Sequence, residues 1–215
     1  MHRTRSARSL YPALLATAIG MAAHAQDPPS SACSFQGFSA RDTLAAVARA
    51  ATGYRGCATA ASCMLAKLVA GDMVTPYRTE GAWTCGYIQE RNGAGPGWVK
   101  TSDLHEIHAD PAPPLAAWVG TWTNGGGRIR ITVGGAGTLH LVGENEWHGR
   151  AGVVHTGEFE GDARPEGNHL HFEESGAGSC TVDLTLIGNY LAANDNEACG
   201  GMNVRFWGTW KRVGK

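Results

Sequence analysis

The sequence predicts an all-β protein whose C-terminal half is an eight-stranded antiparallel up-and-down barrel. Thirty glycines separate short apolar runs, a pattern typical of turn-rich β-structure. Apolar and polar residues alternate from Cys180 to Leu186, which is the period of a strand with one exposed face. Gly120-Thr121-Trp122 recurs as Gly208-Thr209-Trp210 near the end of the chain. The first and last strands of this barrel are therefore expected to be neighbours.

Residues 1–25 have the features of a secretory signal peptide. Three arginines precede an apolar run from Leu10 to Ala23, and Ala23-His24-Ala25 places small residues around a cleavage point. Pro12 interrupts the run, and no later stretch reaches the about 20 apolar residues of a membrane span. We therefore expect an exported protein, periplasmic or secreted, without a membrane span.

The charge balance argues against one class of partner, and the cysteine content indicates the compartment. Removing the leader with its three arginines reduces the 18 basic side chains to 15, against 19 acidic ones, which argues against nucleic acid as a partner. All six cysteines follow the leader and suit an oxidising compartment, where they can form three disulfides. Zinc binding is the weaker interpretation, because five residues separate Cys57 from Cys63 and no CxxC pair occurs.

Residues 33–107 are expected to form the first domain. Ser39 to Thr52 is alanine-rich and favours a helix on propensity alone. The following residues instead predict strands, on both sides of the Gly71-Asp72 turn, at 82–88 and at 97–99.

The order of these features resembles the bacterial SH3-like domain over residues 44–104. The resemblance rests on the Gly71-Asp72 turn before Val74, then Trp83, Gly97-Trp98-Val99 and Leu104. It implies a small SH3-like barrel whose first strand has the form NVRxxP. Only Val47 and Arg49 match that strand, so residues 40–52 stay open between helix and strand.

Aromatic side chains are the candidate binding residues. Aromatic residues line the groove in SH3-type recognition, where they hold an extended peptide. The candidates of the first domain are Tyr77, Trp83 and Tyr87, although core packing is an equally good interpretation of Trp83. Trp98 is assigned to the core. Trp147, on a charged loop, is the candidate of the second domain, and its alternative role is a lid over the barrel mouth.

The cysteines are interpreted as structural. A turn at Gly188-Asn189 folds the strand that begins at Cys180 back on the next one, which places Cys199 opposite Cys180 to within about one residue. A disulfide between these two residues is therefore expected. Three pairings of the other four cysteines stay open, among them Cys33 with Cys85 and Cys57 with Cys63.

Residues 108–117 are interpreted as a linker, followed by the barrel at 118–213. Three prolines between residues 111 and 114 make the linker extended and stiff, so the two domains are expected to be held apart. The expected barrel strands are Trp118–Thr123, Arg128–Val133, Thr138–Val142, Val153–Glu160, Asn168–Glu173, Cys180–Ile187, Tyr190–Ala193 and Asn203–Arg212. The residues expected to face inward are Trp122, Ile129, Ile131, Val133, Leu139, Leu141, Leu170, Phe172 and Trp210.

Two further resemblances concern this second domain. The opening GTWTN, followed by alternating strands, is similar to the start of lipocalins and avidins, which implies a small barrel. The ending, with Asp-Asn, then Cys-Gly-Gly, then an aromatic-Gly-x-aromatic strand, resembles the C-terminal module of uncharacterised exported bacterial proteins. Some such modules are associated with lysozyme inhibition.

Two patterns suggest chemistry, and both have a simpler interpretation. His169 and His171 share one face of a strand, about 7 Å apart, which is compatible with metal binding, but they are expected to point to solvent because Leu170 and Phe172 point inward. Paired acids occur at Glu144/Glu146, Glu158/Glu160 and Glu173/Glu174. Glycosidase chemistry requires two acids facing each other in unlike environments, whereas these are expected to form a solvated rim. We expect no metal and no other cofactor.

The function expected from the sequence is binding. No GxSxG, HExxH, P-loop or dinucleotide fingerprint occurs, so a non-enzymatic protein is favoured. We expect an exported cell-envelope protein that recognises peptidoglycan, a stem peptide or a periplasmic protein through the SH3-like domain. One alternative is an inhibitor of a cell-wall hydrolase such as lysozyme, because the acidic charge balance suits a cationic target. The other is a barrel for a small apolar ligand, which the large inward-facing residues disfavour.

Overall fold

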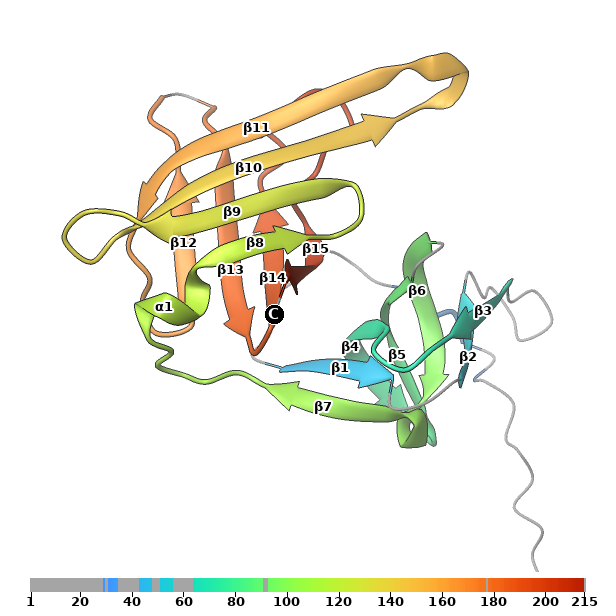
Figure 1. Ribbon diagram of the computed structural model, residues 1–215. Coiled ribbons are helices and arrows are strands. Elements are labelled where there is room, and N and C mark those ends of the chain that lie inside the picture. The colour runs from blue at the N-terminus through green and yellow to red at the C-terminus, as the bar shows by residue number, and fades with distance from the viewer. Residues whose placement is uncertain are drawn as a thin grey trace, which may run out of the picture.

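The computed structural model describes residues 29, 31–34, 43–47, 51–55, 64–90, 93–176 and 178–214. Two antiparallel sheets account for most of the secondary structure in these ranges (Figure 1). The predicted all-β class is confirmed. The predicted leader, residues 1–25, and the predicted pair of Cys57 with Cys63 lie outside the described residues.

The first sheet has seven strands in the order β3-β2-β6-β5-β4-β1-β7. They are β1 (Thr43–Val47), β2 (Ala51–Arg55), β3 (Met64–Leu68), β4 (Met73–Glu80), β5 (Trp83–Glu90), β6 (Gly93–Lys100) and β7 (Leu104–His108). The described part of the segment left open between helix and strand is therefore a strand. Backbone pairing of β1 with both β4 and β7 overrides the helix propensity of its alanines.

The core of the first sheet contains a disulfide and two tryptophans. Cys33 is bonded to Cys85, one of the pairings left open by the sequence. Trp83 and Trp98 pack beside this bond and are 3% and 0% exposed. The indole nitrogen of Trp98 donates a hydrogen bond to the Ser31 carbonyl oxygen at 3.1 Å. The bond and the tryptophan together fasten the segment around Cys33 to the sheet.

The second sheet has eight strands in the order β11-β10-β9-β8-β15-β14-β13-β12 and nearly closes into a barrel. They are β8 (Gly120–Thr123), β9 (Gly127–Val133), β10 (Leu139–His148), β11 (Val154–Ala163), β12 (His169–Glu173), β13 (Thr181–Ile187), β14 (Tyr190–Asp195) and β15 (Gly208–Val213). Because Trp122 on β8 is paired with Arg212 on β15, the first and last strands are neighbours as predicted. The seam of the barrel lies between β11 and β12.

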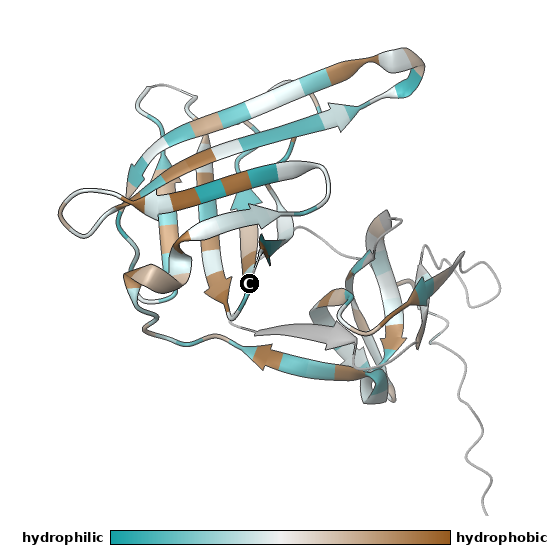
Figure 2. Cartoon of the chain, viewed as in Figure 1, coloured by the Kyte–Doolittle hydropathy of each residue, from teal (hydrophilic) through white to brown (hydrophobic). Residues whose placement is uncertain are grey.

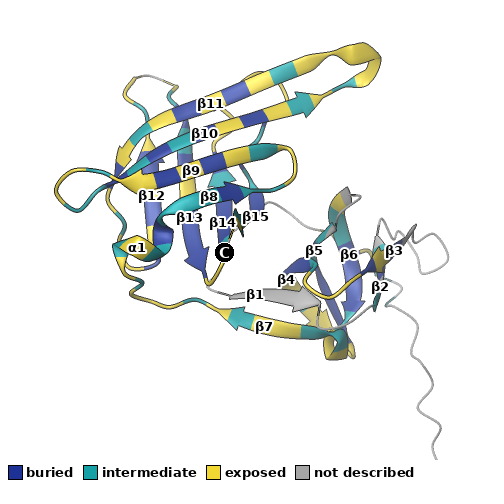
Figure 3. Cartoon of the chain, in the orientation of Figure 1, coloured by how far each residue is buried: buried dark blue, intermediate teal, exposed yellow. Residues whose placement is uncertain are grey.

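Alternating residues of the barrel strands form its core. Figure 2 shows hydrophobic and hydrophilic residues alternating along β9, and Figure 3 shows the same alternation in burial. Of the nine residues predicted to face inward, Val133 is the exception, at 67% exposure, because it lies at the end of β9 beside a turn. The other eight belong to one buried cluster, in which the large rings of Phe159, Phe206 and Trp210 pack against one another.

Two strand boundaries differ most from the prediction. β10 continues to His148 instead of ending at Val142, because its polar second half pairs with β11 over its whole length. Trp147 therefore lies on a strand, not on a loop. Residues 203–207, predicted as strand, precede β15 without belonging to it. They form part of the long connection from β14.

A short helix, α1 (Leu115–Trp118), ends the predicted linker and covers one end of the barrel. Trp118 is fully buried in the barrel core, so this residue is helical and not the start of a strand as predicted. Its carbonyl oxygen accepts a hydrogen bond from the Trp122 indole at 3.1 Å. Arg212 donates to the carbonyl oxygens of Ala117 and Val119, and its guanidinium lies 4.1 Å from the Trp122 ring centroid. Burial lowers the pKa of Arg212.

The two sheets pack against each other, so the expectation that the linker holds the domains apart is wrong. Met73 of β4 is buried in one cluster with Ile187 and Ala192 of the barrel. Burial at this contact raises the pKa of Tyr190, which packs beside the same cluster. Removal of these apolar side chains from water stabilises the contact between the two sheets.

The predicted disulfide between Cys180 and Cys199 is present, and it closes a sequence separation of 19 residues at the β13–β14 hairpin. Replacing both cysteines by alanine is expected to lower the free energy of unfolding of the barrel by about 3 kcal/mol, because the unfolded chain regains loop entropy. Thermal unfolding of the full chain measures this. The control, Cys33→Ala with Cys85→Ala, should destabilise the first sheet and leave the barrel transition in place. Non-reducing peptide mapping that links Cys180 to any cysteine except Cys199 would contradict the assignment.

Candidate functional site

The candidate site is a cleft of about 250 Å³ between the first sheet and the barrel, called here the interdomain cleft. The lining residues of the first sheet are Tyr87, Gln89 and Ala94. Those of the barrel are Asn124, Gly126, Asn145, Glu146, Trp147, Asn203, Arg205, Trp207 and Gly208. The site therefore exists only because the two sheets are in contact.

β5 supplies the wall on the side of the first sheet. Tyr87 and Gln89 are two residues apart on this strand, so their side chains leave the same face. The Gln89 amide forms two hydrogen bonds with the backbone of Thr209: its nitrogen donates to the carbonyl oxygen at 2.9 Å, and its oxygen accepts from the N–H at 3.2 Å. Thr75 places its hydroxyl 3.4 Å from that of Thr209. These contacts tie β4 and β5 to the start of β15.

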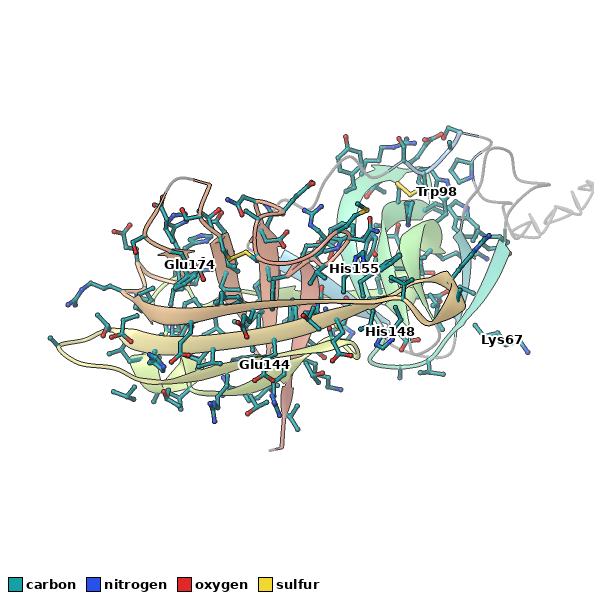
Figure 4. The ribbon with its side chains drawn as sticks, turned by 90° about the horizontal axis from the view of Figure 1, so that it is seen from above. Lys67, Trp98, Glu144, His148, His155 and Glu174 are labelled. Atoms are coloured by element: carbon teal, nitrogen blue, oxygen red, sulfur yellow. A yellow bond between two sulfur atoms is a disulfide. The ribbon has the colours of Figure 1, made fainter. Side chains whose placement is uncertain are left out.

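The hairpin of β10 and β11 supplies a second wall. Both strands run past the rest of the barrel (Figure 1), and His148 and His155 lie on the outer part of the hairpin (Figure 4). Trp147 and His155 are paired across the hairpin, with ring centroids 5.3 Å apart. Trp147 comes two residues after the buried Asn145, so the two side chains leave the same face of β10, and both residues line the cleft.

The connection between β14 and β15 supplies the third wall. Asp195, whose side chain is buried, accepts hydrogen bonds from the Phe206 backbone at 2.7 Å and from Arg205 Nε at 2.8 Å. A second carboxylate, Glu197, accepts from Arg205 Nη1 at 2.8 Å. The guanidinium carbon lies 5.6 Å from the Trp207 ring centroid. The disulfide at Cys199 anchors the same connection, so its side chains are held in place before any ligand arrives.

Rings and polar groups therefore meet in the interdomain cleft. Tyr87 and Trp207 are in contact, with centroids 5.3 Å apart and planes inclined by 52°. Asn124 accepts backbone hydrogen bonds from Gly126 and Gly127 through its oxygen, at 3.2 and 3.0 Å. Its Nδ2 atom has no hydrogen-bond acceptor within the described part of the chain. Glu146 places one carboxylate oxygen 3.1 Å from His148 Nε2.

The four predicted binding residues lie in different parts of the structure, and only two of them line the cleft. Tyr87 and Trp147 both line the interdomain cleft. Trp83 instead packs in the core of the first sheet, edge-on to Tyr54 with centroids 5.3 Å apart, which favours the packing interpretation. Tyr77 is 41% exposed on β4 and is not a cleft residue. A single groove through all four residues, as in SH3-type recognition, is therefore not formed.

The lining residues that sequence reasoning missed include Gln89, Arg205 and Trp207. Arg205 and Trp207 lie in the segment 203–207, which was predicted to be the beginning of the last barrel strand. Phe206 does point inward and is fully buried. The available signal was the alternation itself, because residues on either side of an inward Phe206 must point outward.

The other chemical candidates lie on outer faces. His169 and His171 are exposed on β12, and each contacts a partner on β13: Thr185 at 3.0 Å and Asp183 at 2.7 Å. Within the described ranges, no three His, Cys, Asp or Glu side chains are arranged to hold a metal ion. Glu144 is exposed on β10 and is bonded to Arg128 at 2.6 Å.

Comparisons with known proteins return nothing that identifies the chain. No family model matches the sequence, and no curated protein or solved structure matches it significantly. In the portion of the chain that the structure describes, no helix is both long and apolar enough to cross a membrane.

Replacing Gln89 with alanine is expected to loosen the contact that forms the interdomain cleft. The two hydrogen bonds to Thr209 are lost, which corresponds to about 1 kcal/mol per bond. The Thr209 amide should therefore exchange with solvent several-fold faster in hydrogen–deuterium exchange. Thr132→Ala, at an exposed position on β9, is the control and should leave this exchange unchanged. Equal protection of Thr209 in Gln89→Ala and in the parent protein would contradict the role of the bond.

Proposed function

We propose that this chain is an exported, non-enzymatic binding protein of the cell envelope, which holds peptidoglycan or a periplasmic protein in the interdomain cleft. The observation that carries the proposal is the convergence of Tyr87, Trp147 and Trp207 from three separate segments on one cleft. Rings on a concave surface are the usual means of excluding water from a bound ligand. The first sheet, where the SH3-like resemblance lies, contributes Tyr87 and Gln89.

The two described disulfides support an extracellular or periplasmic location. One of them joins Cys33 to Cys85 in the first sheet, and the other joins Cys180 to Cys199 in the barrel. Such bonds persist in oxidising compartments. The predicted leader at residues 1–25 is also consistent with export.

The composition of the cleft favours binding over hydrolysis. Glu146 is the single carboxylate among its lining residues, whereas hydrolysis of glycosidic bonds by acids requires two carboxyl groups. The remaining polar residues are amides and the guanidinium of Arg205, which is already paired with Asp195 and Glu197. Amide and guanidinium groups can orient a ligand through hydrogen bonds, which suits binding.

Peptidoglycan binding is tested by co-sedimentation of the full chain with purified sacculi. Trp207→Ala and Tyr87→Ala are each expected to weaken binding by about tenfold, which corresponds to about 1.4 kcal/mol. Loss of a ring that the ligand covers accounts for an effect of this size. The matched control is Tyr77→Ala, because Tyr77 is exposed outside the cleft. Binding that depends on Tyr77 and not on Trp207 would place the site elsewhere, and absence of binding by the parent protein to sacculi would argue against peptidoglycan.

A second candidate, inhibition of a cell-wall hydrolase such as lysozyme, is favoured by the charge of the β10–β11 hairpin. Its outer face presents five exposed or half-exposed carboxylates, those of Glu144, Glu146, Glu158, Glu160 and Asp162. Such a face is complementary to a cationic enzyme.

In a lysis assay, an excess of the protein is expected to slow lysozyme, and the double substitution Glu158→Gln with Glu160→Gln should weaken this inhibition. Adding salt should weaken it further, because exposed charges are screened. Glu106→Gln, on the exposed strand β7, is the control. Lysis at an unchanged rate would exclude lysozyme as the target.

A further inference from the structure

We propose that the interdomain cleft binds one ring of a neutral pyranose sugar, of the N-acetylhexosamine class that makes up peptidoglycan strands. This inference rests on the proposed function and specifies its ligand, selecting the glycan strand over the stem peptide. Three properties of the cleft support it: its fixed rings, its mixture of hydrogen-bonding groups and its lack of surplus positive charge.

The rings of the cleft form a preorganised apolar corner. Trp207 contacts Tyr87, at a centroid distance of 5.3 Å, and the guanidinium carbon of Arg205 lies 5.6 Å from the Trp207 ring centroid. Trp147 is held by His155 across the hairpin. A pyranose presents C–H groups on its faces and hydroxyl groups at its rim. Flat rings that cover one face and polar groups that meet the rim are therefore complementary to it.

The polar groups of the cleft match a ligand whose substituents both donate and accept hydrogen bonds. Asn124 presents Nδ2, and Arg205 has Nη2 free of hydrogen bonds to the described residues. The amide of Asn203 adds an acceptor. A hydroxyl group can satisfy either kind of partner, and an acetamido group offers one N–H and one carbonyl oxygen.

The charges around the cleft select a neutral ligand over an acidic peptide. Arg205 is the single cation among the lining residues, and Asp195 and Glu197 already neutralise it at 2.8 Å each. Glu146 adds a further negative charge. The carboxylates of a stem peptide would therefore meet no surplus positive charge, whereas the hydroxyl groups of a sugar need none.

The size of the cleft matches a single ring at a time. Its volume of about 250 Å³ lies below the about 300–1,000 Å³ of sites for drug-sized ligands. Gly126, Asn145 and Glu146 also line a second hollow of about 440 Å³, so the two hollows are neighbours. A glycan can therefore place one sugar in the cleft and continue along the ends of β9, β10 and β11.

The test is titration of the full chain with N-acetylchitotetraose, a soluble oligomer of N-acetylglucosamine, followed by tryptophan fluorescence and calorimetry. We expect saturable binding that Trp207→Ala weakens at least tenfold. Trp147→Ala, at a position outside the apolar cores, should weaken it as well and provides a second variant if Trp207→Ala fails to fold. Tyr77→Ala should bind like the parent protein.

A second titration uses the stem tetrapeptide without sugar. Cleft-dependent binding of the tetrapeptide, with none of the oligosaccharide, would overturn the sugar assignment while leaving the envelope-binding function intact. Oligosaccharide binding that survives both tryptophan substitutions would also overturn it. Failure of the parent protein to bind sacculi, oligosaccharide and tetrapeptide alike would instead reject peptidoglycan as the partner in the proposed function, and the sugar assignment with it.

Discussion

The contact of Arg212 with Trp122 is the constraint on which the rest of the barrel depends. The guanidinium lies over the indole ring and donates to the carbonyl oxygens of Ala117 and Val119, while the indole donates to Trp118. Carbonyl groups at the end of a helix otherwise need water or another donor. Arg212 thus supplies hydrogen-bond donors to the backbone carbonyl groups at the end of α1. In this way it also links the residues just before the first barrel strand to the last strand. Gly120 has a φ of +151°, a conformation that favours glycine, and a Cβ there would lie 2.8 Å from Arg212 Nη1, so the guanidinium would have to shift.

The position of β15 then determines the geometry of the interdomain cleft. The start of this strand is bound to Gln89 of the first sheet, and the residues just before it carry Arg205 and Trp207. Buried Asp195 fixes those residues, since a buried carboxylate is costly unless its oxygens accept hydrogen bonds. The same few residues therefore hold the two sheets together and orient the aromatic rings that face the proposed ligand.

Most barrel strands could be predicted from the sequence, whereas the cleft could not. Alternation and glycine turns are local signals, so they located the strands and the partner of Cys180. The extension of β10 was missed because its outer half is polar and packs on no core. The full burial of Trp83 and the partial burial of Trp207 depend on which surface each segment meets in the folded chain. No local pattern encodes the contact of Met73 with the barrel, so a cleft between the sheets was not foreseeable.

The seam between β11 and β12 has a consequence for the order in which the barrel folds. β8 to β11 and β12 to β15 are each a continuous meander in the chain, and within each meander every strand pairs with its sequence neighbour. Only the pairing of β8 with β15 joins residues from opposite ends of the domain, such as Thr121 and Val213. Contacts between residues distant in sequence form slowly, because the chain entropy of closing the loop comes first. The two meanders can therefore collapse independently, the second already oxidised at Cys180 and Cys199, and the barrel is completed last by its two tryptophan-bearing terminal strands.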